Sequence, residues 1–159
     1  MSLLALSLAL ALQASSGPAE AETEVGAILD QLHAAASAAE GEAYFALFTP
    51  DARFIGTDVA ERWTVEQFKA YAMPYFSQGK GWSYTPRTRT VTITTDPCAC
   101  QAWFDEVLDS QSYGTARGSG VLTRTARGWK VAQYVLSFPV PNDIAGDVTE
   151  KIKAFEAAH

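Results

Sequence analysis

Apolar residues recur at helical spacing in the first half of the chain. In residues 21–40 they return every three or four positions, which predicts a helix with one buried stripe. Residues 42–48, rich in aromatic side chains, predict a second and shorter helix. Thr64 and Gln67 have the spacing of a capping box, so a third helix is expected to begin there. Its apolar side consists of Phe68, Tyr71, Ala72, Tyr75 and Phe76.

From residue 82 onward the pattern changes to the two-residue alternation of β-strands, with many Thr, Val, Ile and aromatic residues. Strands are predicted at residues 52–56, 82–95, 101–109, 115–125 and 129–138, with a turn at 49–51 before the first. A last helix at residues 143–157 is expected to bury Ile144, Val148, Ile152 and Phe155. Helices followed by a meander of strands predict an α+β fold, in which helices cover one face of an antiparallel sheet.

The turn between the last two predicted strands decides which side chains face the helices. A three-residue loop at 126–128, with Gly128 in the left-handed conformation, pairs Thr125 with Trp129. The same register pairs Gly120 with Tyr134 and Gly118 with Leu136. The outer face then carries Trp103, Val107, Val121, Trp129, Val131 and Val135. Since monomers rarely leave so large an apolar patch in water, a homodimer is expected.

Glu106 is the only charge on the face that is expected to meet the helices. A buried carboxylate is costly unless it is paired, hydrogen-bonded or protonated. Glu106 therefore either lines a partly wet pocket with a raised pKa or joins a structural network with Arg or Tyr neighbours. Gly118 and Gly120 opposite it remove side-chain volume, as a cavity wall requires. The expected pocket comprises Trp63, Tyr71, Tyr75, Phe104, Glu106, Tyr134 and Leu136.

Composition and charge narrow the classes of function. The 159 residues are 48% hydrophobic and 19% charged, the balance of one folded domain. Twelve Lys and Arg against eighteen Asp and Glu give a net charge of −6, which argues against a nucleic acid or an anionic membrane as partner. His33 has no further ligand at metal spacing, and phosphate-binding glycine motifs are missing from the sequence. No metal and no cofactor are predicted.

Two loops leave alternatives open. Cys98 and Cys100 are separated by a single residue, and an extended chain would hold their Cβ atoms too far apart for a bond. Unpaired thiols are therefore favoured over a local disulfide, and a metal site comes third. Asp58 follows the strand predicted at 52–56 and could reach a pocket mouth, although ordinary turn chemistry is the favoured interpretation.

The N-terminal segment is expected to be removed on export. Residues 3–12 form an unbroken run of Leu, Ala and one Ser, which is shorter than the ~20 residues that span a bilayer. The run fits the apolar core of a signal peptide, and small residues follow it. Residues 1–19 are accordingly assigned to a signal peptide and its cleavage zone, and residues 20–159 to one domain. The mature chain is expected to be periplasmic or secreted and to leave the membrane after cleavage.

Several stretches carry a family resemblance. They are residues 48–52 (FTPDA), 102–106 (AWFDE), 117–122 (RGSGVL) and 128–134 (GWKVAQY). With the helical first half they resemble the SnoaL-like, nuclear transport factor 2-like superfamily over residues 22–157. The resemblance implies a cone in which a curved antiparallel sheet wraps around N-terminal helices, with a C-terminal helix and dimerisation through the outer sheet face. No catalytic set carries over, because Ile55 and Gly56 stand where ketosteroid isomerase-like members place an Asp base.

These observations favour a ligand-binding domain with a mainly apolar conical pocket, which takes a small apolar or amphipathic molecule. The alternative is an acid–base enzyme of the isomerase, dehydratase or cyclase kind, with Glu106 as proton shuttle and Tyr71 or Tyr134 as oxyanion donor. A purely structural dimer module is the third interpretation.

Overall fold

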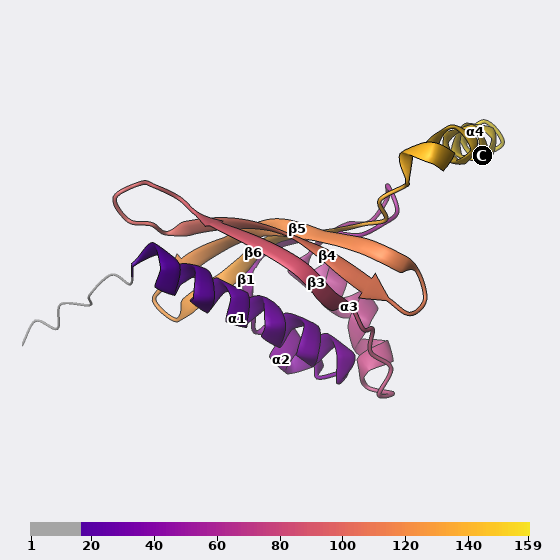
Figure 1. Ribbon diagram of the computed structural model, residues 1–159. Coiled ribbons are helices and arrows are strands. Elements are labelled where there is room, and N and C mark those ends of the chain that lie inside the picture. The colour runs from indigo at the N-terminus through magenta and orange to yellow at the C-terminus, as the bar shows by residue number, and fades with distance from the viewer. Residues whose placement is uncertain (1–16) are drawn as a thin grey trace, which may run out of the picture.

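The computed structural model describes residues 17–159, in which six strands form one curved sheet (Figure 1). The strands are β1 (Phe48–Ile55), β2 (Arg62–Thr64), β3 (Thr85–Ile93), β4 (Gln101–Ser110), β5 (Gly114–Thr125) and β6 (Gly128–Ser137). Their order across the sheet is β2-β1-β6-β5-β4-β3. One face carries α1 (Pro18–Ser37), α2 (Gly41–Phe45) and α3 (Val65–Phe76). This is the predicted α+β architecture.

The first strand differs from its prediction. β1 begins at Phe48 and runs parallel to β6, so the sheet is not wholly antiparallel. The expected turn at residues 49–51 lies inside this strand. Pro50 is tolerated there because the β1–β6 pairing is irregular between Phe48 and Arg53, and a residue without a backbone N–H fits such a place. β2 was not predicted, since three residues are too few to show an alternating pattern.

α1 and α3 bury most of the residues that their sequence pattern predicts. The buried ones include Val25, Leu29, Leu32 and Ala36 of α1, and Phe68, Ala72 and Phe76 of α3. The predicted capping box is present: the Thr64 hydroxyl accepts from the Gln67 N–H, and the Gln67 side chain accepts from the Thr64 N–H. Tyr71 and Tyr75, from the same apolar side of α3, are 49% and 47% exposed.

Two deviations in the last hairpin cancel each other. Its loop is only two residues long, so Thr125 pairs with Gly128 and not with Trp129. A β-bulge at Ala132 then adds one residue to β6 and shifts the pairing back. Beyond the bulge the predicted register is observed: Gly120 pairs with Tyr134, and Gly118 with Leu136.

Between the loop and the bulge, the side chains of β6 point to the opposite face from the predicted one. Trp129 and Val131 were expected on the outer face but are 2% and 0% exposed. The Trp129 indole N–H donates to Glu24 of α1 at 3.0 Å, and the same carboxylate oxygen accepts from Arg124 at 2.6 Å. Trp129 and Val131 therefore belong to the core beneath α1. The outer face keeps Trp103, Val107, Val121 and Val135.

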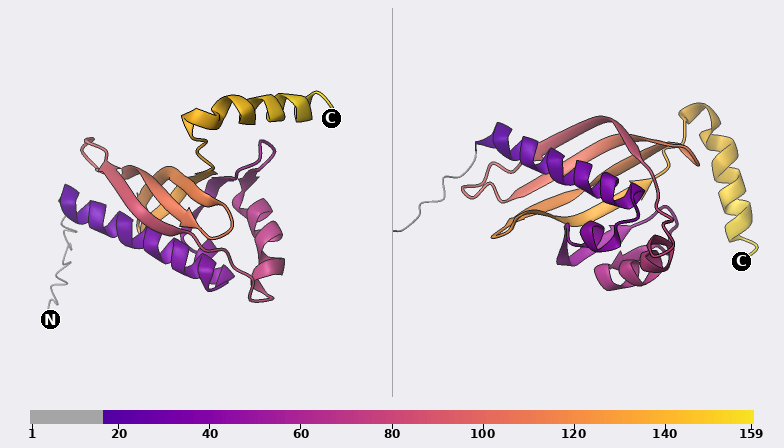
Figure 2. Two further views of the ribbon diagram at one scale, coloured as in Figure 1. Left: turned by 45° about the vertical axis from the view of Figure 1, so that its right-hand side comes forward. Right: turned by 90° about the horizontal axis from the view of Figure 1, so that it is seen from below.

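The C-terminal helix stands away from the body of the molecule. After the 3₁₀ turn Asn142–Ile144, α4 (Ala145–Glu156) lies on the side of the sheet opposite α1, α2 and α3 (Figures 1 and 2). The expected burial of its apolar side is wrong for the described residues. Ile144 and Ile152 are each 49% exposed, Phe155 is 64% exposed, and Val148 is only partly buried. The extended segment 138–141 carries the chain off the sheet before the helix begins.

The loop between β3 and β4 contains a disulfide. Cys98 and Cys100 are bonded, with their Cα atoms 5.1 Å apart, so the expectation of unpaired thiols is wrong. Ala99 between them has a φ of 44°, in the left-handed region. This bend brings together two side chains that an extended backbone would hold apart.

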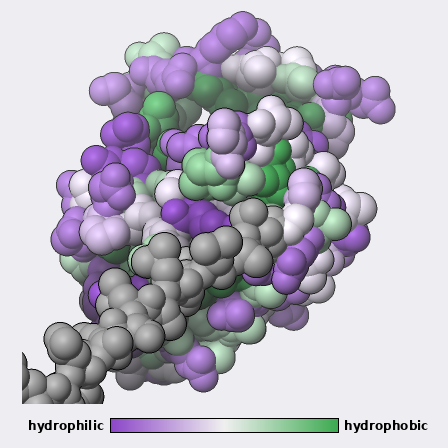
Figure 3. Space-filling model, turned by 90° about the vertical axis from the view of Figure 1, so that its left-hand side faces the viewer, coloured by the Kyte–Doolittle hydropathy of each residue, from purple (hydrophilic) through white to green (hydrophobic). Residues whose placement is uncertain are grey.

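The predicted signal peptide, residues 1–19, lies outside the described residues except for its last three. Pro18 and Ala19 form the start of α1. Figure 3 views the molecule from this side, where hydrophilic and hydrophobic residues are intermixed on the surface. Within residues 17–159, no helix is long and apolar enough to cross a membrane.

Val131 and Val135 lie on the same strand and offer a matched test of the bulge. Val131→Ala is expected to lower the free energy of unfolding by about 2 kcal/mol, because it removes buried carbon and leaves a cavity. Val135→Ala, on the partly exposed outer face, is expected to cost less than about 1 kcal/mol. Urea unfolding at a concentration where the protein is monomeric measures both. Equal losses would contradict the register between loop and bulge.

Candidate functional site

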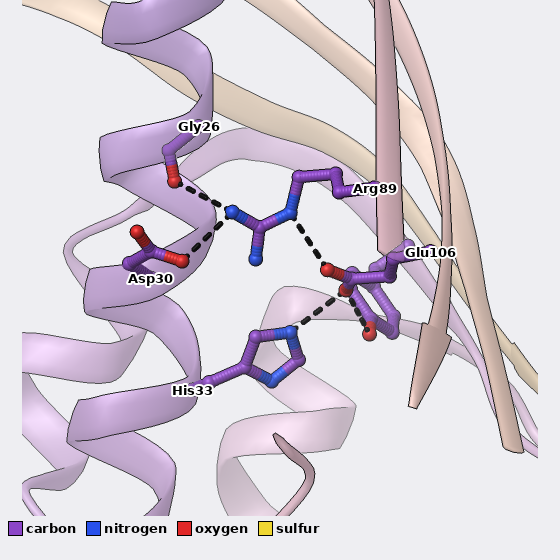
Figure 4. A network of polar contacts seen from close by, with 6 residues as sticks. Gly26, Asp30, His33, Arg89 and Glu106 are labelled. Carbon is purple, nitrogen blue, oxygen red and sulfur yellow. Dashed lines mark hydrogen bonds and ion pairs between the residues drawn. The ribbon is translucent and has the colours of Figure 1, made fainter. Parts of the chain in front are cut away.

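A buried carboxylate lies at the centre of the inner sheet face. Glu106 on β4 is 0% exposed and is paired with Arg89 of β3 on one side and Gly118 of β5 on the other. Its Oε1 lies 2.7 Å from Nε2 of His33 and accepts a hydrogen bond from the Tyr134 hydroxyl at 3.0 Å. Its Oε2 accepts from Nε of Arg89 at 2.9 Å (Figure 4).

Arg89 ties this centre to α1. Its Nη1 donates to the Gly26 carbonyl at 3.0 Å and to Oδ1 of Asp30 at 2.7 Å. The Arg89 side chain is only 14% exposed, whereas that of Asp30 is 70% exposed. Figure 4 shows the guanidinium lying between the helix and the strand that carries Glu106. The buried charge of Glu106 is thus balanced by Arg89, which bonds both to Glu106 on β4 and to two residues of α1.

Gly118 lies opposite Glu106 and Gly120 opposite Phe104, and neither glycine leaves an open cavity. A side-chain carbon at Gly118 would meet the Tyr134 hydroxyl and the Glu106 carboxylate. A side-chain carbon at Gly120 would meet a backbone carbonyl and the ring of Phe104. The volume that these glycines leave is therefore filled by the side chains that they face.

The charges in the network fix its protonation. Burial alone raises the pKa of Glu106, but the hydrogen bonds and charges of His33 and Arg89 outweigh burial and hold that pKa below its ordinary value. Burial, followed by the charge of Glu106, raises the pKa of Tyr134 well above its ordinary value. Glu106 is thus an ionised acceptor beside a neutral phenol. Of the two interpretations from sequence, this arrangement is the structural network.

A small cavity adjoins the network. It has a volume of about 20 Å³, and its walls include His33, Tyr134, Tyr84 and Leu136. That volume is enough for about one water molecule. In Figure 4 the second ring nitrogen of His33 points away from Glu106.

A larger cleft of about 210 Å³ opens at the end of the sheet where β1 and β6 finish and β3 begins. Its walls are mainly aromatic: Phe54, Trp63, Phe68, Tyr71, Trp82, Tyr84, Tyr113 and Phe138, with Gly56, Thr57, Glu61 and Leu136. We call it the outer cleft. Phe54, Trp82, Tyr84 and Leu136 also line the small cavity, so these four side chains lie between the two spaces.

The structure divides the seven predicted pocket residues. Those that line a cavity are Trp63 and Tyr71 in the outer cleft, Tyr134 in the small cavity, and Leu136 in both. Tyr75, Phe104 and Glu106 line neither space. Phe104 and Glu106 are packed into the interior, at 3% and 0% exposure, and Tyr75 lies one helical turn from Tyr71. The predicted pocket is therefore two separate spaces beside a filled core.

His33 and Arg89 were not assigned to this centre by sequence reasoning. Arg89 precedes Val91 and Ile93 by two and four residues, so strand alternation places all three on the inner face. His33 follows Leu29 by four residues and shares its side of α1. Because a buried carboxylate needs cationic partners, these two inward positions were the signal that could have identified them.

The loop between β1 and β2 contains two acidic residues, Asp58 and Glu61. Asp58 takes the turn role that the sequence favours, since its Oδ1 accepts from the Ala60 N–H at 2.8 Å. Glu61, three residues later, lines the outer cleft instead. Within the described part of the chain, no group of three or more His, Cys, Asp or Glu side chains could hold a metal ion.

The lowered pKa of Glu106 predicts a specific acid sensitivity. Glu106 contributes stability above its unfolded pKa, near 4.5, and this contribution is lost as the pH falls from there through the lower folded pKa. Glu106→Gln is expected to cost about 3 kcal/mol at pH 7, because it removes the buried counter-charge of Arg89 and leaves only the exposed Asp30. The variant should also show a flatter loss of stability below pH 4.5.

Urea unfolding across the acid range measures this slope. Glu22→Gln, an exposed position on α1, provides the matched control and should keep the wild-type slope. If Glu106→Gln loses stability on acidification as steeply as the wild type, Glu106 is not the group responsible.

Solved structures share this fold. A protein of unknown function of the nuclear transport factor 2-like type, from Pseudomonas putida, matches with a TM-score of 0.65 and 16% identity, over 79% of this chain and 92% of that chain. A proposed aromatic ring hydroxylase from Novosphingobium aromaticivorans has a TM-score of 0.65 and 17% identity, over 79% and 94%. A proposed dehydratase of the nuclear transport factor 2-like family, from Streptomyces avermitilis, has a TM-score of 0.64 and 13% identity, over 77% of this chain and 99% of that chain. At these identities the likeness shows the fold alone.

Comparison with curated proteins gives no match. The family comparison does: residues 25–141, which contain all six described strands and most of α1, match the SnoaL-like domain. That stretch is well over half of the chain, and the architecture agrees with it. The chain therefore belongs to the SnoaL-like domain family.

Proposed function

We propose that the chain is an exported domain that binds a small, mainly apolar or amphipathic molecule in the outer cleft. The observation that carries this proposal is the lining, in which eight of twelve residues are aromatic around about 210 Å³ of space. Glu106 bonds to His33, Arg89 and Tyr134 and does not line the cleft.

The exposed rings of the cleft support the proposal. Tyr71, Tyr113 and Phe138 are 49%, 63% and 39% exposed. Tyr113 and Phe138 lie against each other with ring centroids 4.8 Å apart, and Trp63 lies 4.9 Å from Tyr71. Large aromatic surfaces gathered in one hollow gain free energy when an apolar molecule removes them from water.

Export is the second part of the proposal. It rests on the apolar run at residues 3–12 and the small residues that follow it. The first buried residue of α1 is Ala21, so cleavage near residue 19 would spare the buried stripe of that helix. The ligand would then be met outside the cytoplasm.

An acid–base reaction is the second candidate, and His33 is the observation in its favour. Glu106 itself is a poor proton shuttle, because its pKa is lowered and it lines neither cavity. Of the two candidate oxyanion donors, Tyr71 lines the outer cleft, and only Tyr134 lies beside Glu106. His33 lines the small cavity and lies 2.7 Å from Glu106, the arrangement of a base held by a carboxylate.

A homodimer is proposed on a revised surface. Without Trp129 and Val131, the outer sheet face still carries Trp103, which is 51% exposed. α4, whose Ile152 and Phe155 are exposed, lies on that same side of the sheet (Figure 2). We propose that a second copy covers both, related by a two-fold axis.

Ligand binding is tested with the mature chain, recovered from the exported fraction and identified by N-terminal sequencing. In a thermal-shift screen of steroids, polyketides, terpenoids and fatty acids, a ligand at a hundredfold its Kd is expected to raise Tm by about 5–10 °C. Tyr71→Ala should weaken binding, because Tyr71 lines the cleft, and Tyr75→Ala on the next turn should not.

The outcome separates the candidates. Uniformly flat melting temperatures would contradict the binding function. If the wild type isomerises or dehydrates a bound ligand and the His33→Asn variant leaves it unchanged, the acid–base reaction replaces binding as the function.

The dimer is tested by sedimentation at micromolar concentration. The mature wild type is expected as a dimer, and Trp103→Arg or Ile152→Glu should each yield monomers with unchanged helix content. Both side chains are about half exposed in the single chain, so neither change disturbs its core. A wild type that sediments as a single species near the mass of one chain would contradict the proposed surface.

A further inference from the structure

The outer cleft carries negative charge and no positive charge. Among its twelve lining residues Glu61 is the only charged one, and Lys, Arg and His are not among them. The whole chain carries a net charge of −6. An anionic ligand would therefore meet repulsion and no positive partner at this site.

Glu61 is held in place but not neutralised. Its backbone N–H donates to the Asp58 carbonyl at 3.0 Å, and its carbonyl accepts from the Gly56 N–H at 2.8 Å. Its Oε2 accepts from the Asp58 N–H at 3.2 Å, and its carboxylate lies over Gly56, where a side chain would meet it. Within residues 17–159, Glu61 forms no salt bridge with Lys, Arg or His.

The rings of the cleft favour a cation as well. The faces of Trp and Tyr rings carry negative charge density, and they attract ammonium groups within about 6 Å of the ring centre. Trp63 and Tyr71 both belong to the lining, and their rings lie against each other with centroids 4.9 Å apart and planes tilted by 31°. Tyr84 and Tyr113 belong to the same lining.

The field of Glu61 reaches these rings. Burial raises the pKa of Tyr71, and the neighbouring Tyr75 and the charge of Glu61 add to that rise. Burial, Tyr113 and Glu61 likewise raise the pKa of Tyr84. The carboxylate thus acts on two phenols of the lining, one from α3 and one from the segment before β3.

We propose that the outer cleft selects organic ammonium ions that carry an apolar body, with Glu61 as counter-ion and Trp63 and Tyr71 as the facing rings. The inference rests on the proposed binding function and narrows its ligand class. The apolar body lies toward Phe54 and Leu136, deeper in the cleft, and the ammonium group lies near Glu61 at the loop between β1 and β2.

Two pairs of probes of equal shape test the charge alone. They are choline with its uncharged isostere 3,3-dimethylbutan-1-ol, and phenyltrimethylammonium with tert-butylbenzene. Binding is followed on the mature chain at low salt by the indole N–H signals of Trp63 and Trp82 in NMR titrations. Each cation is expected to bind roughly tenfold more tightly than its neutral isostere.

Matched variants assign the preference. Glu61→Gln keeps an oxygen for the Asp58 N–H but loses the charge, and it should reduce the cation preference to less than about threefold. Glu66→Gln removes one charge from the exposed start of α3 and should leave the preference unchanged. Trp63→Leu should weaken the binding of the cations more than the binding of their neutral isosteres.

Each failure has a different meaning. Equal binding of cation and isostere, or a preference that survives Glu61→Gln, overturns the ammonium site and leaves the binding function standing. The same conclusion follows if the cleft binds a neutral compound of the thermal-shift screen but neither of the two cations. If neither the probes nor the screen yields a ligand, the binding function itself fails.

Discussion

The fold depends on how it accommodates one buried negative charge. Glu106 has no access to solvent, and three partners from three other elements surround it: His33 of α1, Arg89 of β3 and Tyr134 of β6. Gly118 of β5 supplies the space. Because an unpaired charge in this position would cost several kcal/mol, the helix and the sheet can only come together in the arrangement that brings all of these groups to one point. The centre of the inner sheet face is consequently polar and holds only a small cavity, and the larger open space lies at the end of the sheet.

Most of the fold could be predicted from alternation and helical spacing, and the exceptions have local causes. The pairing of Gly118 with Leu136 follows from parity along the strands and is observed. The predicted three-residue loop is wrong, yet the error ends at Ala132, because the bulge there restores the register. A bulge leaves no mark in the hydrophobic pattern, so the inward orientation of Val131 could not be derived. The apolar side of α4 likewise predicts burial, but a helix pattern does not say whether the covering surface belongs to the same chain.

The candidate site was predicted only in part. A lone Glu106 on an apolar face identifies the buried centre, and the need for cationic partners follows from its burial. The identity of those partners depends on how α1 lies across β3, which the sequence does not contain. The outer cleft was outlined by Trp63 and Tyr71, while Glu61 was passed over because its loop has ordinary turn chemistry. Loop residues acquire their position from the elements at both ends, and spacing alone does not supply it.

Glu106 is held as an ionised group by its three partners, which lower its pKa against the effect of burial. Its side-chain carboxyl ¹³C resonance, followed by NMR from neutral pH into the acid range, reports the ionisation of this one residue directly. We expect the chemical shift of a carboxylate throughout, with any protonation beginning only below the ordinary glutamate pKa of 4.5. A midpoint near neutrality would contradict it, since it would show a carboxyl group whose burial outweighs Arg89 and His33 and which can exchange protons at physiological pH.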